Sequence, residues 1–331
     1  SYSVTGVQTC ALPILAKARN YVAGVATSTI FGFSFIFTKG ALETLDLSEL
    51  LFLRFLSAAL LLSALALFGV IKLDYKGKDL RILFATALLQ PTLYFLVETE
   101  GLKRADASTA GILLSAIPVT VTVLAGFILK ERLRPVQTLT SLLSFAGVVL
   151  VVWFRASGRI GGEPLGFLLL VIAVLCAASF NIASRFGSRS FAPVETTFFM
   201  LWFGTLAFGS VFLFRTLGGG LGADLLARLT PRAIGSIAYL ALMSSVVAFF
   251  LMNYNLSKLK SPEAAVFANL TTVVSVLAGV SIRGERLLPS DLVGAAMIVA
   301  GVWGTNVLGK ARPIELHAAS KEKLRSDEPS V

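Results

Sequence analysis

The chain has 331 residues, of which 56% are hydrophobic and only 15% are charged, and its mean hydropathy is +0.81. Soluble domains carry about 25% charged residues, so this composition excludes an ordinary soluble enzyme and a disordered chain. The formal net charge of +10 comes from Lys and Arg residues scattered singly between apolar runs. No basic stripe for nucleic acid is present, and an integral membrane protein is predicted.

The predicted elements are apolar runs of about 20 residues, which is the length needed to cross a hydrocarbon core of about 30 Å. They lie at 20–38, 49–70, 80–99, 107–129, 135–154, 164–184, 194–214, 233–254, 262–282 and 290–309. The connections between them are short. We therefore predict an all-α integral membrane fold with ten transmembrane helices.

The two ends of the chain differ from this pattern. Residues 1–14, SYSVTGVQTCALPI, are too polar for a span and lack the basic start of a signal peptide; we expect a non-native or disordered leader. Residues 310–331 are polar and are expected to form a disordered tail. The segments on the side of the membrane that holds both chain ends carry more Lys and Arg than those on the other side. A multi-pass plasma-membrane protein with cytoplasmic termini is therefore expected.

The two halves of the chain resemble each other. At an offset of 154 residues, Glu131-Arg132-Leu133 falls on Glu285-Arg286-Leu287, and Gly147 falls on Gly301. Residues 15–157 and 158–309 are therefore predicted to be two five-helix repeats. Because five is odd, the second repeat is inserted upside down. Inverted repeats are typical of secondary transporters, in which two similar halves open a shared site to either side in turn.

These residues carry a resemblance to a known family. The layout resembles the drug/metabolite transporter superfamily, and specifically ten-span proteins with two EamA domains. The matching residues are Phe31-Gly32, Lys39, Arg54, Ala110 to Pro118, Glu131-Arg132-Leu133 and Gly147, then Arg185, Ala264, Glu285-Arg286-Leu287 and Gly301. The sequence departs from the pattern at Phe31 and Ala177, where the family often has Trp, and at Thr272, which replaces a proline. The resemblance implies transport of small metabolites such as amino acids, often taken to be driven by protons.

A polar stripe is predicted on the third helix. Gln90, Tyr94 and Glu98 are spaced four residues apart and share one face, and that face should point away from lipid. Glu98 has two interpretations. It either forms an ion pair with Arg54 or Lys39 that fixes the helix register, or it carries a proton or the amine of a substrate.

Further candidates for substrate contact are polar residues deep in other spans, where interhelical packing is the alternative role. They are Ser115, Asn181, Asn253, Asn269 and Thr272. Asn269 and Thr272 are the repeat counterparts of Ser115 and Pro118. Lys39 and Arg185 end the first span of each repeat, and together with Arg54 they form a predicted gating or charge network. Each either attracts an anion or reaches the lipid phosphates.

The predicted function is a secondary active transporter, more an exporter than an importer, of amino acids or related amphipathic compounds. The alternatives are a receptor or scaffold, a membrane-embedded enzyme, and an organophosphate or nucleotide-sugar carrier. An enzyme would need a catalytic or metal-binding set within the spans, yet the only histidine is His317 in the tail. We expect no catalytic residue, no cofactor and no metal site. The expected partners are a small-molecule substrate and the lipid bilayer, and the expected state is a monomer or weak homodimer.

The small residues and turns have structural predictions. Ala296, Ala300 and Gly304 form a stripe in the tenth span that should allow close helix packing. The two Glu-Arg-Leu turns should cap helix ends at the membrane surface.

Overall fold

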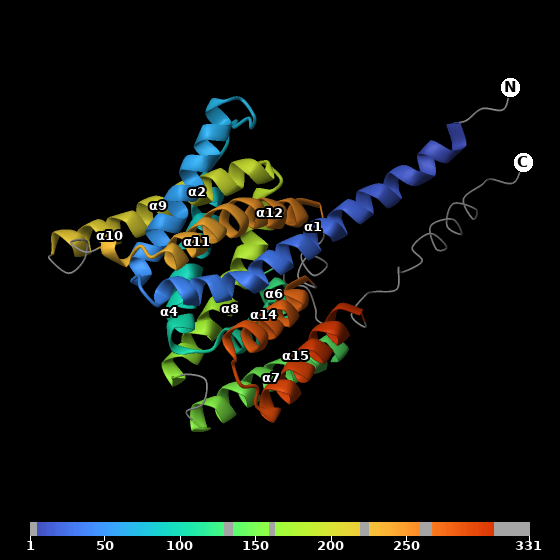
Figure 1. The fold of residues 1–331 in the computed structure, drawn as a ribbon. Coiled ribbons are helices and arrows are strands. Elements are labelled where there is room, and N and C mark those ends of the chain that lie inside the picture. Colours follow the sequence, from blue (N-terminus) through green and yellow to red (C-terminus); the bar gives the residue numbers. More distant parts are fainter. Residues whose placement is uncertain (1–4, 129–134, 159–162, 219–224, 259–266, 308–331) are drawn as a thin grey trace, which may run out of the picture.

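The computed structural model describes residues 5–128, 135–158, 163–218, 225–258 and 267–307, and these form helices joined by short turns (Figure 1). The helices of the first half are α1 (Thr5–Leu42), α2 (Leu47–Leu67), α3 (Arg81–Ala87), η1 (Leu88–Leu93), α4 (Tyr94–Arg104), α5 (Ala107–Leu114), α6 (Ile117–Ile128) and α7 (Pro135–Gly158). Those of the second half are α8 (Pro164–Gly187), α9 (Pro193–Leu217), α10 (Leu225–Arg228), α11 (Pro231–Tyr239), η2 (Leu240–Ala248), α12 (Phe249–Lys258), α14 (Phe267–Arg283) and α15 (Pro289–Val307). The all-α prediction is confirmed.

Eight stretches of the described chain are long and apolar enough to cross a membrane, and two shorter apolar helices, Leu270–Arg283 and Pro289–Gly304, follow them. These ten stretches coincide with the ten predicted runs. The chain is thus a multi-pass membrane protein. The exact number of spans, the inverted orientation of the halves, the two domain ranges and the properties of both ends stay predictions.

Two of the predicted single helices contain a π-helical segment near their middle, and the first of the two is also kinked there. The third run consists of α3, η1 and α4, and the eighth consists of α11, η2 and α12. Both η segments are π-helical, and they occupy corresponding positions in the two halves. In η1, Gln90 has non-helical dihedrals of φ −147° and ψ 121°. Pro91 explains this break, because proline lacks an N–H and disfavours the helical conformation of the preceding residue.

The ends of several helices follow from local sequence. Pro164, Pro193 and Pro231 each occupy the first turn of a helix, where the missing N–H breaks no intrahelical bond. The Oε2 atom of Glu49 accepts a hydrogen bond from Asp46 N (2.9 Å) at the start of α2. Such reciprocal capping satisfies backbone donors that have no partner within the helix.

Each helix of the first half packs on the same partners as its counterpart in the second half, with the two halves interchanged. α1 packs on α14 and on the helix formed by α11, η2 and α12, whereas its counterpart α8 packs on α5 and α6 and on α4. The other extensive pairs join counterparts: α2 with α9, α5 with α14, and α7 with α15. The α7–α15 pair lies at one side of the bundle (Figure 1), and Gly304 packs there against Thr140, as predicted for the small-residue stripe.

Two ion pairs tie the halves together at corresponding places. Glu49 caps α2 and pairs with Arg228 of the second half, with Oε1 and Nη2 2.5 Å apart. Its repeat counterpart Glu195 accepts a hydrogen bond from Ala192 N (2.8 Å) at the start of α9 and pairs with Lys78 of the first half, at 3.0 Å. Both glutamates are buried. The duplication thus extends to polar contacts as well as to apolar spacing.

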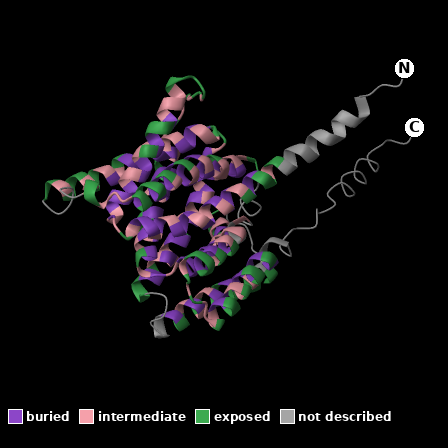
Figure 2. Ribbon diagram, viewed as in Figure 1, coloured by how far each residue is buried: buried purple, intermediate pink, exposed green. Residues whose placement is uncertain are grey.

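Buried residues concentrate between the helices, while exposed residues occupy the outer faces (Figure 2). Large apolar side chains are among the exposed ones, including Leu139, Trp153, Phe214 and Trp303. On a soluble protein such a surface would aggregate. Around a membrane bundle it is the surface that contacts lipid.

Candidate functional site

A cavity lies where the two halves meet, with an empty volume of about 930 Å³ that includes its opening. Both halves supply its walls. The first half provides Gly24, Thr27, Ser28, Phe31, Ser34, Phe35, Gln90, Tyr94, Phe95, Glu98, Gly111, Leu114 and Ile117, and the second provides Ala177, Asn181, Met252, Asn255, Leu256, Phe267 and Thr271. Both halves of the chain therefore contribute to one shared cavity.

The polar stripe of the third predicted helix forms part of this wall. Gln90, Tyr94 and Glu98 all line the cavity, as their spacing predicts, and all are buried. Gln90 lies within η1, at the break of the helix. Its repeat counterpart Ser244 lies within η2. Broken helices near the membrane midplane commonly form transporter binding sites, because their freed backbone groups can face a solute.

Glu98 is 3% exposed and accepts a hydrogen bond from Thr99 Oγ1 (3.1 Å). Within the described residues it has no ion pair, and the predicted pair with Arg54 or Lys39 is wrong. Both cations are bound elsewhere. A carboxylate therefore stands in the cavity wall without a bonded cation.

Arg54 is 2% exposed and links α2 to η2. Its Nε donates to Ser245 Oγ (2.8 Å), and its Nη2 donates to Ser244 Oγ (2.7 Å). The guanidinium carbon lies 4.3 Å from the centroid of the Phe95 ring, a cation–π contact. Arg54 is not among the residues that line the cavity.

The structure separates the remaining predicted contact residues. Asn181 lines the cavity, whereas Asn253 is buried between helices, accepting from Ser184 Oγ (2.9 Å) and donating to Thr197 Oγ1 (3.0 Å). Its neighbour Asn255 lines the cavity instead. Residues two positions apart on a helix point to different faces, so only one of these two asparagines can line the cavity. The position of the apolar run alone did not indicate which one.

The fourth and ninth predicted spans approach each other closely. Thr272 Oγ1 donates to Gly111 O (2.8 Å), which joins α14 to α5, and Ser115 donates to Ile112 O (2.6 Å) within its own turn. Neither lines the cavity, although Gly111 and Thr271 do. Asn269 belongs to α14, and its side chain lies outside the described residues.

Lys39 and Arg185 have equivalent positions, as the repeat predicts. Lys39 Nζ donates to Ala105 O (2.6 Å), just past the end of α4, and Arg185 Nη1 donates to Leu256 O (2.8 Å), near the end of α12. Each cation therefore binds a carbonyl where the broken helix of its own half ends, where the helix dipole favours positive charge.

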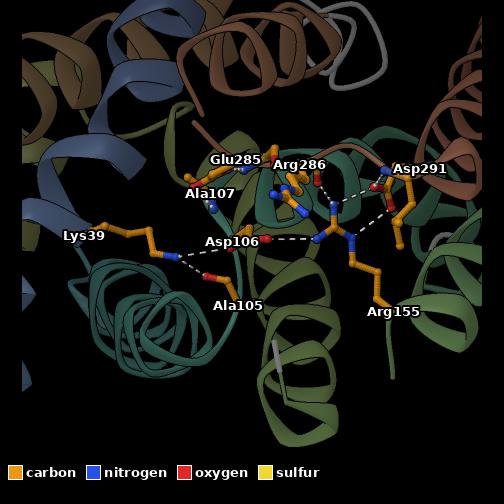
Figure 3. A network of polar contacts seen from close by, with 10 residues as sticks. Lys39, Ala105, Asp106, Ala107, Arg155, Glu285, Arg286 and Asp291 are labelled. Carbon is orange, nitrogen blue, oxygen red and sulfur yellow. Dashed lines mark hydrogen bonds and ion pairs between the residues drawn. The ribbon is translucent and has the colours of Figure 1, made fainter. Parts of the chain in front are cut away.

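Next to Lys39, a chain of charged groups crosses one end of the bundle (Figure 3). Lys39 Nζ lies 3.9 Å from Asp106 Oδ1, and Asp106 Oδ2 accepts from Arg155 Nη1 (2.9 Å). Arg155 in turn binds both oxygens of Asp291, through Nε (2.9 Å) and Nη2 (2.5 Å). Arg155 and Asp291 are both fully buried. We call these four residues the Lys39-end network; it joins α1, the start of α5, α7 and α15.

Glu285 extends this layer, as Figure 3 shows, by capping α5 through Ala107 N (3.0 Å) and Ser108 N (2.8 Å). The predicted capping role is confirmed for this turn, while Glu131 lies outside the described residues. Burial, followed by the like charge of Glu285, raises the pKa of the Asp106 carboxyl above its ordinary value, and Lys39 and Arg155 oppose that shift.

Sequence reasoning missed this network. Arg155 and Asp291 lie near the ends of predicted spans, where charged residues ordinarily face the membrane surface. The signal that could have found them is the repeat itself: no charged residue stands at the corresponding Gly309 and Gln137. Because the repeated fold forms in the other half without these charges, Arg155 and Asp291 are features of one half only.

Two matched sets of spans, with π-helical segments at matched positions, enclose a shared cavity, an arrangement typical of membrane transporters built from repeats. The comparison with family models agrees, since residues 19–153 and 164–307 each match the EamA-like transporter family. The chain belongs to this family. It is a membrane transporter, and the predicted resemblance is confirmed.

Relatives of known sequence carry the same general name. The uncharacterized transporter YcxC of Bacillus subtilis (strain 168) is 34% identical over 288 residues, covering 87% of this chain and 92% of the relative. An uncharacterized transporter of Archaeoglobus fulgidus is 24% identical, covering 86% and 98%. One solved crystal structure matches the fold with a TM-score of 0.63 at 17% identity, covering 88% of this chain and 98% of the other.

Proposed function

We propose that the protein is a secondary active transporter that carries small amphipathic metabolites, of about the size of amino acids, across the plasma membrane by alternating access. The observation that carries this proposal is the position of the cavity. It lies between the two repeats, and its wall includes Gln90 at the break of the third predicted helix and Met252 of α12, just beyond the π-helical segment of the counterpart helix. Rocking of two similar halves about such a site exposes it to each side in turn.

The described conformation fits a state of the transporter in which the cavity is closed at the end of the bundle that holds Lys39. The described lining residues reach Phe35 and Glu98 but include no member of the Lys39-end network. Toward the other end they include Gly24, Asn255 and Phe267. With both termini in the cytoplasm, as the basic residues favour, this state faces inward, ready to load a solute for export.

Proton coupling is proposed to act through Glu98. A buried carboxylate without a bonded cation is costly in a low-dielectric interior, so Glu98 favours either a proton or a positively charged solute. Arg54, from α2, is the charged group that acts on Glu98 through space. Alternate occupancy of one carboxylate by proton and solute would couple their opposite movements.

The test uses the full chain reconstituted in liposomes with a panel of amino acids, amines, purines and organic phosphates. Wild-type protein is expected to accumulate at least one solute against its gradient when a pH gradient is applied. Glu98→Gln should lose this accumulation. The matched control is Glu100→Gln, because Glu100 pairs with Arg104 outside the cavity. Wild-type liposomes that move none of these solutes, with or without a pH gradient, would refute transport; full uphill transport by Glu98→Gln would refute coupling through Glu98.

A further inference from the structure

We propose that the substrate is an organic monocation, an amine or quaternary ammonium on an apolar or aromatic body, without a carboxylate or phosphate. This inference rests on the proposed function and specifies the charge of the solute that the cavity accepts. It follows from three features: the charge of the wall, the character of its apolar surface, and the positions of the nearby cations.

The charge of the wall comes from one residue. Among the described lining residues, Glu98 is the single charged side chain; the other polar ones, such as Gln90, Asn181 and Asn255, are neutral amides or hydroxyls. A cation in the cavity would give Glu98 a partner at ion-pair distance, which no described residue supplies, since Arg54 acts on Glu98 only from farther away. An anion there would meet a second negative charge in a low-dielectric interior, where repulsion is strong.

The apolar surface of the cavity is rich in aromatic rings. Phe31 and Phe35 from α1, Tyr94 and Phe95 from α4, and Phe267 from α14 all line it. The face of an aromatic ring attracts ammonium groups, and the same rings bury an apolar body by the hydrophobic effect. An aromatic wall beside one carboxylate is therefore matched to an amphipathic cation.

The nearby cations are committed to protein groups. Arg54 donates through Nε and Nη2 to Ser245 and Ser244, and it does not line the cavity. Lys39 is bound to Ala105 O and paired with Asp106. The carboxylate of an amino acid would thus enter the described cavity without a positively charged partner, and burying an unpaired charge is unfavourable. The cavity should consequently prefer an amine to the amino acid with the same side chain.

The experiment compares four ligands that share a phenyl ring on a two-carbon chain: phenethylamine (cation), phenylalanine (zwitterion), 3-phenylpropionate (anion) and 2-phenylethanol (neutral). Binding to the purified full chain in detergent is measured by titration calorimetry and by the shift in melting temperature, since a ligand that binds the folded state stabilises it. Phenethylamine is expected to bind at least about tenfold more tightly than each of the other three, the effect of one charged hydrogen bond.

Variants of the chain identify the carboxylate. Glu98→Gln should weaken phenethylamine binding by about tenfold or more, while the control Glu100→Gln leaves it unchanged. Phenylalanine or 3-phenylpropionate binding as tightly as phenethylamine to wild-type protein would overturn the proposal without any variant. Absence of phenethylamine binding to the wild type would overturn it as well. Uphill movement of a zwitterion or anion by wild-type liposomes would contradict this inference and leave the proposed transport function intact.

Discussion

The substitution Arg155→Gln tests whether the buried part of the Lys39-end network stabilises the fold. Arg155 and Asp291 both have side chains that are 0% exposed. Removing the guanidinium takes two hydrogen bonds from Asp291, at 2.9 and 2.5 Å, and leaves it the backbone donor Leu288 N (2.7 Å). Breaking one side of a buried ion pair costs about 3–5 kcal/mol, because a charge stays buried without compensation. We expect the free energy of unfolding to fall by about that amount.

The assay is denaturant unfolding of the full chain in detergent, completed as a double-mutant cycle with Asp291→Asn. The double variant removes both charges, so it should lose less stability than the sum of the two single variants. The control is Arg81→Gln, because Arg81 and its partner Asp79 have side chains 94% and 73% exposed; the expected change there is close to zero. A loss below about 1 kcal/mol for Arg155→Gln, or strictly additive losses in the cycle, would refute the reasoning.

Three further predictions use the same unfolding assay. Gly301→Ala should destabilise by about 1–3 kcal/mol, because a Cβ there would lie 2.5 Å from Thr140 O, whereas Gly235→Ala, with nothing within 4 Å, should be neutral or stabilising; equal effects would contradict close packing of α7 on α15. Glu49→Gln and Glu195→Gln should each cost about 1.5–3 kcal/mol, and a large loss in only one would show that the two capping pairs are not equivalent. The pKa of the Asp106 carboxyl is raised in the folded state, which therefore holds the proton more tightly than the unfolded state does. The contribution of Asp106 to the free energy of unfolding consequently falls as pH rises above 3.8, the ordinary pKa of the group. The stability advantage of wild type over Asp106→Asn should therefore shrink from pH 3.5 toward neutrality, roughly across that interval, and an advantage that grows with pH would contradict the shift.

The scaffold could be predicted from sequence because apolar length and repeat spacing determine it directly. Each apolar run requires a helix, since lipid offers no hydrogen bonds to the backbone, and the break in the third run has a local cause in the sequence, Pro91. Nothing comparable marks the π-helical segment of the eighth run, because η2 contains no proline. It became recognisable only through its repeat counterpart η1.

The site could be predicted in part. The spacing of Gln90, Tyr94 and Glu98 placed all three in one wall, because a helical face is a local property. The partners of Arg54 and Lys39 were not predictable, since they lie 191 and 66 residues away along the chain. Side chains distant in sequence meet according to helix packing, which span boundaries alone do not determine.

The contrast between the symmetric scaffold and the asymmetric site explains where function is encoded. Glu98 and its repeat counterpart Met252 both line the cavity, so duplication supplied two equivalent wall positions, of which only one is charged. A second carboxylate at 252 would repel the first in the same low-dielectric space. One acid facing a polarisable thioether instead leaves a cavity that a single positive charge can neutralise. In the proposed mechanism, the repeat provides the means of alternating access, and the difference between the repeats provides selectivity for charge.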